Sequence, residues 1–450
     1  MGKYFGTDGI RGVANTELTC ELAFQTGRAA AIVLSRVCKH RAKIYIGKDT
    51  RISSDMLECA LAAGISSMGA DVGLLGYLPT PAVAYLTVQH GADAGIVISA
   101  SHNPMQYNGI KIFNAEGYKL SDELEAEIEA LIDAETTPET GTGAAVGRVT
   151  HKEDCAQEYV DYLAKTIDGD LSGLRALVDC ANGASSATAP ELFKKLRADA
   201  KVIFHSPTGT NINENCGSTK MDALRSQVVS GGFDVGVAFD GDADRCLIVD
   251  EKGAVVDGDR IMAICADTMR REGNLPHDTF VATVLSNLGL HAYARAHGMQ
   301  VAASAVGDRN VLELMRKEGY ALGGEQSGHV IFLGHSTTGD GELTAVQFLH
   351  ILKKSGKCVS ELVSEIEQYP QVMINVTVPN AEKARVLADD AVLAAMEEVR
   401  QQLGDEGRIL VRPSGTEPLV RVMVEGRASD LVNALAGQVA DVVERAVNAG

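Results

Sequence analysis

The chain has 450 residues, of which 45% are hydrophobic, and its formal net charge is −19 at pH 7. This length exceeds what one hydrophobic core organises and indicates about three or four domains. The acidic balance argues against a nucleic-acid partner, because phosphate backbones are bound by basic surfaces. No stretch approaches the roughly 20 apolar residues of a membrane span, so we expect no membrane partner.

The cysteines bear on the cellular compartment. All nine are scattered along the chain, and none forms a CxxC pair. Such usage is typical of reduced thiols and predicts neither a disulfide framework nor a zinc site. The N-terminal segment 1–6 lacks the apolar core of a signal peptide. We therefore expect a cytoplasmic protein.

Strand-like and helix-like runs alternate along most of the chain, which is typical of α/β layers with largely parallel strands. In the first block we expect strands at 43–47, 71–75 and 94–98 and helices near 54–68 and 121–133. The segment 136–147 is poor in large apolar residues, so we expect a loop or linker there.

Two further blocks repeat this alternation, and a last block changes it. The second has expected strands at 174–179, 200–204 and 234–239 and helices near 189–197 and 221–230. The third begins around Asp257 with a long helix, followed by expected strands at 279–284, 300–306 and 329–332. The last is a smaller α+β unit, with expected strands at 372–378, 408–411 and 419–425 and helices at 381–403 and 429–447.

These blocks predict an α/β protein with three similar mixed α/β domains and a smaller C-terminal α+β domain. The predicted domains are 1–150, 151–253, 254–368 and 369–450.

Ser101 lies directly after the apolar run 94–98, in a segment that continues to Asn103 and Pro104. This pattern indicates a buried strand that ends in a sharp turn. Ligands of open α/β sheets gather at the carboxyl ends of strands. The serine could accept a phosphoryl group, act as a nucleophile or only form the turn, and the local residues leave these alternatives open.

Three aspartates, Asp240, Asp242 and Asp244, alternate on a glycine-bearing loop between the apolar runs 235–239 and 246–249. Their carboxylates can converge on one hard cation. Mg²⁺ is favoured over Ca²⁺, because the EF-hand spacing and its distal glutamate are missing. A polar hairpin turn with solvated acids is the alternative, although three clustered charges repel one another without a cation.

The segment 411–418, with Arg421 on the following strand, has the composition of a phosphate cradle. Small residues let backbone N–H groups approach an anion, two hydroxyls can donate, and Arg412 and Arg421 supply charge. The Walker lysine pattern is missing, so no P-loop nucleotide site is implied. A plain turn is the alternative.

The segment 323–329 places polar side chains between glycines. Glu325 and Ser327 suit the recognition of sugar hydroxyls, whereas His329 is equally well explained as a structural histidine. Cationic residues also lie on the loops 6–12, 48–51 and 307–309, each of which could be a surface turn. Together they supply the local positive charge that an anionic ligand requires in an acidic protein.

Combined, these loops contain the parts needed for phosphoryl transfer to and from a sugar phosphate. The assembled motifs resemble those of the α-D-phosphohexomutase superfamily, and the likeness extends over essentially the whole chain. It rests on the segments YFGTDGIRG (4–12), ASHNP (100–104), DGDADR (240–245), GEQSGH (324–329) and RPSGTEP (412–418). Gln326 and the segment TTGDG (337–341) favour the branch that acts on glucosamine phosphates.

The resemblance implies four domains around a central active-site cleft. It implies interconversion of glucosamine 6-phosphate and glucosamine 1-phosphate, an isomerase step in UDP-N-acetylglucosamine and peptidoglycan precursor synthesis. The cofactors would be a phosphoserine at Ser101 and one Mg²⁺ per chain, held by Ser101, Asp240, Asp242 and Asp244. The substrate-binding residues would be Glu325, Ser327, His329, Arg309, Arg412, Ser414, Gly415, Thr416 and Arg421.

In the implied reaction, phosphoserine 101 donates its phosphoryl group to the sugar, and a 1,6-bisphosphate intermediate then returns the other one. Arg245 would hold the carboxylate loop in shape. Lys111 is the first candidate for the general base, followed by His102, Arg11 and His329. A phosphomannomutase/phosphoglucomutase and a sugar phosphatase are the alternatives. The expected partner is a small hexosamine phosphate, and a homodimer is one option for the assembly.

Overall fold

The structure, a computed structural model, describes residues 2–6, 8–36, 38, 40–134, 140–414 and 418–448. The chain folds into two compact units. The first comprises Met1–Leu285 and Met299–Ser364, and the second comprises Ser286–Gly298 and Glu365–Gly450. Among the described residues, no helix has both the length and the apolar character needed to cross a membrane.

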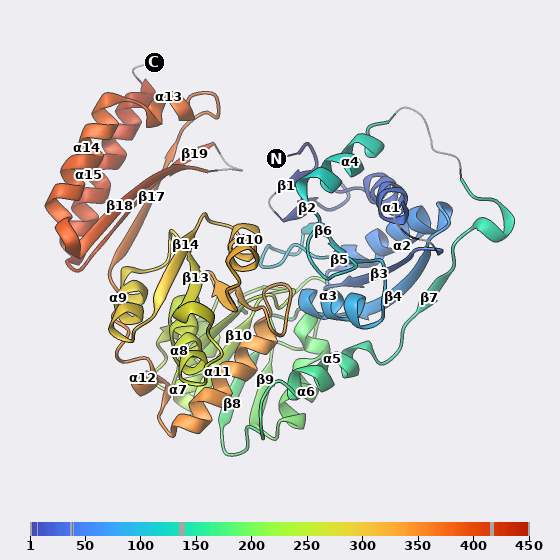
Figure 1. The fold of residues 1–450 in the computed structure, drawn as a ribbon, viewed down its shortest axis with the longest axis horizontal. Helices are drawn as coiled ribbons and strands as arrows, with labels where there is room; N and C mark the ends of the chain where they lie inside the picture. The colour runs from blue at the N-terminus through green and yellow to red at the C-terminus, as the bar shows by residue number, and fades with distance from the viewer. Residues whose placement is uncertain are drawn as a thin grey trace. The chain divides into compact units, whose positions relative to one another are not determined.

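The first sheet has seven strands in the order β1-β2-β6-β5-β3-β4-β7 (Figure 1). They are β1 (Phe5–Gly6), β2 (Gly9–Val13), β3 (Lys43–Lys48), β4 (Asp71–Tyr77), β5 (Ala94–Ile98), β6 (Tyr107–Asn114) and β7 (Val149–His151). The accompanying helices are α1 (Cys20–Ser35), α2 (Ile52–Ser67), α3 (Thr80–Gln89) and α4 (Asp122–Ile132). β3 pairs in parallel with β4 and β5, whereas β6 is antiparallel to β5.

The second sheet has the order β12-β11-β10-β8-β9. Its strands are β8 (Arg175–Asp179), β9 (Asp199–Ile203), β10 (Val235–Phe239), β11 (Cys246–Asp250) and β12 (Val255–Val256). The helices of this region are α5 (Cys155–Ala164), α6 (Ala189–Lys195) and α7 (Asp222–Gly231). β8, β9 and β10 are parallel, and β11 is antiparallel to β10.

The third sheet has the order β14-β13-β15-β16. Its strands are β13 (Thr279–Thr283), β14 (Gln300–Ser304), β15 (Leu322–Gly324) and β16 (Val330–Phe332). The helices that belong to it are α8 (Gly258–Arg271), α10 (Asp308–Glu318), α11 (Gly341–Ser355) and α12 (Val359–Leu362). β16 is antiparallel to β15, and the other pairings are parallel.

These three sheets share one topology. In each, the antiparallel strand is followed across the sheet by the third, the first and the second parallel strand in chain order. The three corresponding orders are β6-β5-β3-β4, β11-β10-β8-β9 and β16-β15-β13-β14. The predicted set of three similar mixed α/β domains is therefore confirmed. The runs β5 and β10 are buried along their whole length, as expected for strands covered on both faces.

The C-terminal unit is built differently, around the antiparallel sheet β17-β19-β18. Its strands are β17 (Gln371–Thr377), β18 (Gly407–Pro413) and β19 (Leu419–Gly426). Its helices are α9 (Leu288–Ala296), α13 (Lys383–Leu387), α14 (Asp390–Leu403) and α15 (Ser429–Asn448). The predicted smaller α+β domain is confirmed, but the single helix expected at 381–403 is two helices. Asp389 interrupts it by capping α14, because its side chain accepts a hydrogen bond from the Ala391 N–H.

The four segments singled out in the sequence occupy one topological position. Each joins a strand to its antiparallel neighbour: β5 to β6, β10 to β11, β15 to β16 and β18 to β19. In the three mixed sheets this position is the carboxyl end of a parallel strand, where ligands of such sheets bind.

Candidate functional site

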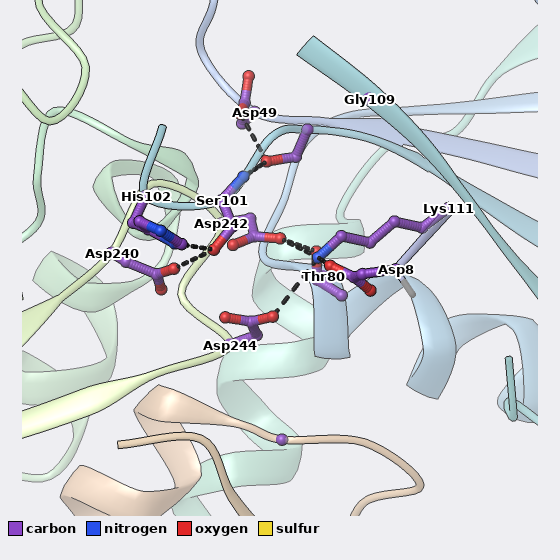
Figure 2. A network of polar contacts seen from close by, with 12 residues as sticks. Asp8, Asp49, Thr80, Ser101, His102, Gly109, Lys111, Asp240, Asp242 and Asp244 are labelled. Atoms are coloured by element: carbon purple, nitrogen blue, oxygen red, sulfur yellow. Dashed lines mark hydrogen bonds and ion pairs between the residues drawn. The ribbon is translucent and has the colours of Figure 1, made fainter. Parts of the chain in front are cut away.

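Ser101 lies just beyond the buried strand β5, with 1% of its surface exposed and a left-handed backbone (φ 51°). Its hydroxyl donates a 2.5 Å hydrogen bond to Asp240 Oδ2 and lies 3.4 Å from His102 Nδ1 (Figure 2). Its N–H donates to Ser99 Oγ, and that hydroxyl donates in turn to Asp49. A left-handed conformation is unfavourable for serine, so surrounding contacts must hold it.

Arg51 provides much of that support. Its side chain is fully buried, and its Nε pairs with Asp49 Oδ2 at 2.9 Å. The guanidinium also donates to four backbone carbonyls around the serine, those of Ser101 (2.9 Å), Asn103 (2.8 Å), Pro104 (2.5 Å) and Tyr107 (3.0 Å). Removing one partner from such a buried, hydrogen-bonded pair is costly. The serine loop is therefore locked from within its own domain.

The second domain holds the same loop from the other side. Asn213 Nδ2 donates to the carbonyls of Ser101 and Asn103, at 2.9 and 3.1 Å. At Gly241 an added Cβ would lie 2.5 Å from the Ser101 carbonyl oxygen, so glycine is needed for this approach. These contacts place the acidic loop directly against the serine.

The acidic loop forms a buried group of three carboxylates. One oxygen from each of Asp240, Asp242 and Asp244 lies within 4.8 Å of the other two. Asp242 Oδ1 and Asp244 Oδ1 are buried and have no hydrogen-bond partner among the described residues. Burial, with the neighbouring carboxylates Asp244 and Asp242, raises the pKa of Asp240 well above its ordinary value. Orphaned oxygens and mutual repulsion are what a hard divalent cation would relieve.

Lys111 Nζ neutralises part of this charge. It lies 2.9 Å from Asp242, 3.1 Å from Asp8 and 3.4 Å from Asp244, and the side chain is 1% exposed. Burial lowers the pKa of Lys111, but these three carboxylates outweigh it and raise the pKa well above its ordinary value. The group is therefore an ammonium in this arrangement. The imidazole of His102, in contrast, is neutral, because burial and then Arg245 and Arg11 lower its pKa to about 4.

The Glu325 loop packs onto the start of β11, next to the acidic loop. The Cys246 N–H donates to the Gly328 carbonyl, and a Cβ on Gly328 (φ 93°) would lie 2.4 Å from the Cys246 oxygen. Glu325 Oε1 accepts from the Gly307 N–H at 3.0 Å, and Ser327 Oγ lies 3.4 Å from Glu325 Oε2. The two residues predicted to bind sugar hydroxyls therefore lie together, with Glu325 oriented by the loop before α10.

His329 connects this loop to the acidic loop. Its ring is buried, with Nδ1 3.6 Å from Asp244 Oδ2 and Nε2 3.7 Å from Asp308 Oδ2. The Gly339 N–H lies 3.1 Å from Nε2. Burial lowers the pKa of His329, but Asp244 and then Asp308 outweigh it and raise the pKa. These contacts support the structural role that the sequence left open for this histidine.

A charged group formed by Asp8, Lys119 and Asp308 was not predicted from the sequence. Lys119 Nζ pairs with both carboxylates, which belong to the first and third domains. Asp8 also pairs with Arg11. Asp8 and Asp308 lie inside the cationic loops noted in the sequence, whereas nothing local distinguishes Lys119 from other lysines.

Two predicted arginines contact acidic partners. The Arg245 N–H donates to Asp240 Oδ1 at 3.3 Å, and its Nε lies 3.9 Å from Asp244 Oδ1. Arg309 Nη2 donates to Glu125 Oε1 at 2.7 Å, and Nη1 pairs with Asp122. Arg245 thus contacts the carboxylate loop as predicted, while Arg309 contacts α4.

The predicted phosphate cradle lies in the C-terminal unit. Arg412 and Arg421 are directly opposite each other on β18 and β19. Like charges in such a cross-strand pair repel, and an anion between them would reduce that repulsion. Ser414 is buried, and its carbonyl accepts a 2.7 Å hydrogen bond from Lys383 Nζ. Gly415 and Thr416 lie outside the described residues.

Family comparisons cover nearly the whole chain. Four phosphoglucomutase/phosphomannomutase models match in order: alpha/beta/alpha domain I at 2–139, domain II at 157–253, domain III at 257–369 and the C-terminal domain at 373–442. A phosphoglucosamine mutase of Acetivibrio thermocellus is 53% identical over 445 residues, covering 99% of each chain. One from a Thermoanaerobacter species is 51% identical over 450 residues, covering 100% of each.

Solved structures agree on the fold. A phosphoglucomutase/phosphomannomutase family protein from Burkholderia thailandensis superposes with a TM-score of 0.81 at 23% identity, covering 99% of this chain and 98% of that one. An N-acetylphosphoglucosamine mutase from Aspergillus fumigatus, solved with GlcNAc-6P and magnesium, gives 0.70 at 19% identity, covering 99% and 96%.

Proposed function

Because the chain belongs to the phosphoglucosamine mutases of the phosphoglucomutase/phosphomannomutase family, we propose that it interconverts glucosamine 6-phosphate and glucosamine 1-phosphate. It is an isomerase of amino sugar metabolism, and its partner is a small phosphorylated sugar. The observation that carries the mechanism is the hydroxyl of Ser101, held against Asp240 at the carboxyl end of β5.

Ser101 is the phosphoryl carrier in this proposal. The bond between phosphorus and Ser101 Oγ breaks as a bond to the free sugar hydroxyl oxygen forms. That hydroxyl loses its proton, and Oγ regains one. The product is a 1,6-bisphosphate, whose other phosphoryl group then returns to Ser101 in the reverse step, leaving the isomeric monophosphate. The arrangement of the serine loop serves positioning, which dominates catalysis of phosphoryl transfer.

Proton transfer at the serine is assigned to His102, because its Nδ1 lies 3.4 Å from Ser101 Oγ. Lys111, the first candidate for a base in the sequence, acts here as a cation that positions the acidic loop, since its ammonium contacts three carboxylates. Arg11 contacts the same network through Asp8.

The three aspartates suit magnesium, since they offer oxygen ligands and two of their oxygens are buried with no hydrogen bond from the described part of the chain. Asp240, Asp242 and Asp244, with an oxygen on phosphorylated Ser101, would hold one Mg²⁺ per chain. The ion would supply charge neutralisation for the transferring phosphoryl group. Arg245 would keep the carboxylate loop in shape through its contacts with Asp240 and Asp244.

Two groups of residues are assigned to substrate binding. Glu325 and Ser327 would bind sugar hydroxyls, with His329 behind them as the link to the acidic loop. Arg412, Ser414, Gly415, Thr416 and Arg421 would bind the phosphate that is not being transferred. Arg309 would contact substrate only after releasing Asp122 and Glu125. The domain limits 1–150, 151–253, 254–368 and 369–450, the homodimer and the cytoplasmic location stay predictions.

Intact mass and substrate turnover test this proposal together. We expect the intact mass of the active enzyme to include one phosphate, located on the peptide that contains Ser101. Treatment with a phosphatase, or with an excess of the sugar monophosphate that accepts the group, should remove it. Ser101→Ala should lose the phosphate and all turnover while keeping its circular dichroism. Ser226→Ala, at an exposed serine on α7, is the matched control and should keep both.

Substrate comparison separates the rival functions. Turnover of glucosamine 6-phosphate should exceed that of glucose 6-phosphate and mannose 6-phosphate. A preference for either neutral sugar would replace the proposed substrate. Release of inorganic phosphate at the rate of substrate loss would instead identify a sugar phosphatase.

A further inference from the structure

A second cluster of ligand-type side chains lies at the opposite end of the first sheet from Ser101. Cys38 and His40 lie between α1 and β3, and Asp93 immediately precedes β5, the strand whose far end leads to Ser101. Five strand residues separate the two ends, which corresponds to roughly 17 Å. The cluster is therefore separate from the catalytic loops.

The three side chains converge on one point. The Cys38 thiol donates a 3.2 Å hydrogen bond to Asp93 Oδ1, and His40 Nε2 lies 3.5 Å from the same oxygen. Ligand atoms of all three residues are within 4.8 Å of one another. In a tetrahedral zinc site, bond lengths of about 2.0–2.3 Å place sulfur and oxygen ligands about 3.5 Å apart and nitrogen and oxygen about 3.3 Å apart. The observed separations are close to these values.

The orientation of the histidine is an independent indication. His40 Nδ1 lies 3.0 Å from the Arg41 carbonyl oxygen, which can only accept, so Nδ1 carries the hydrogen. In the neutral ring, Nε2 then presents its lone pair to the Asp93 carboxylate. Two acceptors at this distance repel each other unless a proton or a metal ion lies between them. A ring nitrogen fixed by a carbonyl is the usual arrangement for a metal-binding histidine.

The carboxylate is oriented in a similar way. Asp93 Oδ2 accepts a 2.7 Å hydrogen bond from the Lys43 N–H, which leaves Oδ1 facing the thiol and the imidazole. The side chain of Lys43 points elsewhere, since its Nζ donates to the His90 carbonyl. That of Arg41 donates to the carbonyls of Ala144 and Val146. Neither cation occupies the point on which the three ligands converge.

We propose that Cys38, His40 and Asp93 form a binding site for one zinc-class divalent transition-metal ion, with the remaining coordination position open to water. A thiol, an imidazole and a carboxylate suit zinc, whereas magnesium prefers oxygen ligands alone. The His40 side chain is 64% exposed, so the site is reachable from solvent. An occupied site would tie the segment between α1 and β3 to the start of β5.

Binding includes a proton release. The Cys38 thiol carries its proton in this structure, because Sγ donates a hydrogen bond to Asp93 Oδ1. When the metal binds, a sulfur–metal bond forms and the thiol proton passes to the buffer. The competing explanation is that the hydrogen bond from the Cys38 thiol to Asp93 holds the cluster together, with no metal involved.

Cobalt(II) is the probe that separates these explanations, because a thiolate–cobalt bond gives an absorption band that oxygen and nitrogen ligands do not. The full chain, saturated with Mg²⁺ to occupy the aspartate site, is titrated with Co²⁺. We expect one equivalent to produce the thiolate band, Zn²⁺ to abolish it, and calorimetry in buffers of different ionisation enthalpy to detect about one proton released per metal.

Variants locate the site. Cys38→Ser should eliminate the band, and Asp93→Asn and His40→Gln should each weaken metal binding at least about tenfold. Asp93→Asn keeps an oxygen for the Lys43 N–H, and His40 is exposed, so both variants should fold. Cys59→Ser, at an exposed cysteine on α2, is the matched control and should retain the band. A folded wild-type protein without the band, or a band unchanged in Cys38→Ser, would overturn the proposal whatever the outcome for the mutase reaction.

Discussion

The serine loop and the phosphate cradle both join antiparallel strands, yet they are held in opposite ways. The serine loop is buried, and Arg51 and Asn213 bind its carbonyls from two domains. The cradle instead presents two half-buried arginines from neighbouring strands of a separate compact unit. The chemical step needs a serine fixed against the acidic loop, whereas binding a phosphate needs charge at the end of long side chains. Substitutions in the two regions should therefore affect different kinetic constants.

The largest effect on catalysis is expected at the acidic loop, against which the serine is fixed. Asp242→Asn removes a charge from the group that would hold the cation. Losing a residue that merely orients a metal ligand costs roughly 10- to 100-fold in metal affinity, and losing a ligand should cost more. We expect kcat to fall and the Mg²⁺ concentration for half-maximal rate to rise together.

Thr80→Val is a milder change at the same carboxylate than Asp242→Asn. Thr80 Oγ1 donates a 2.6 Å hydrogen bond to Asp242 Oδ2, so this variant disturbs the orientation of the carboxylate without removing its charge. Its magnesium titration should lie between those of the wild type and Asp242→Asn. An unchanged titration in Asp242→Asn would remove this residue from the metal site.

In the cradle, Arg421→Ala should mainly raise KM. A charge-assisted hydrogen bond contributes about 1.5–3 kcal/mol, which corresponds to roughly a 10- to 100-fold increase. kcat should change little, because the phosphate held there is bound equally in the ground state and the transition state. Arg400→Ala, at an exposed arginine on α14, is the control. A fall in kcat alone would contradict the assignment of Arg421 to phosphate binding. It would also show that the cradle and the serine loop do not affect different kinetic constants.

A smaller effect on kcat is expected at Asn213. Asn213→Gly removes two hydrogen bonds to the serine loop, but Arg51 still donates to both carbonyls. We therefore expect the lower end of the usual about 0.5–1.5 kcal/mol per bond, so kcat should fall roughly 5-fold with little change in KM. Glycine tolerates the left-handed backbone of this residue (φ 57°). Asn215→Gly has the same backbone character (φ 54°) at an exposed position and should behave like the wild type. An effect on KM alone would assign Asn213 to substrate binding.

The last effect is expected on stability and not on catalysis, at a residue that packs next to the acidic loop. Asp340 caps α11, and the next N–H, of Gly341, donates to the Ala243 carbonyl. Burial raises the pKa of Asp340 to about 6, so the folded state holds a proton that the unfolded state has already lost above about pH 4. This contribution to stability is present at low pH and is lost as the pH rises through 6.

Asp340→Asn has no such proton and tests this directly. Between pH 4 and pH 7, the free energy of unfolding of the wild type should fall relative to that of the variant by about 2 kcal/mol, as measured by denaturant unfolding of both proteins. A difference that stays constant over this range would show that Asp340 keeps the same charge in both states.

Much of the fold was predictable because it depends on local patterns. The apolar runs that became β5 and β10 are continuous in the sequence, and their burial follows from composition. The break between α13 and α14 was missed, because an aspartate can either cap a helix or lie on its polar face. The shared strand order of the three mixed sheets also depends on pairings that periodicity does not encode.

The sequence by itself determined the four loops and their chemistry, because the residues that define each loop are close together in the chain. The three aspartates of the acidic loop are one example, and the small residues and arginine of the phosphate cradle are another. Only the tertiary structure decided what supports them. Arg51 binds a carbonyl 50 residues away, and Lys119 pairs with Asp308 across 189 residues. Likewise, 53 to 55 residues separate His40 and Cys38 from Asp93, so CxxC spacing does not indicate that these three side chains meet. Such groups act together only because folding brings distant segments into contact, and short-range sequence patterns carry no record of that.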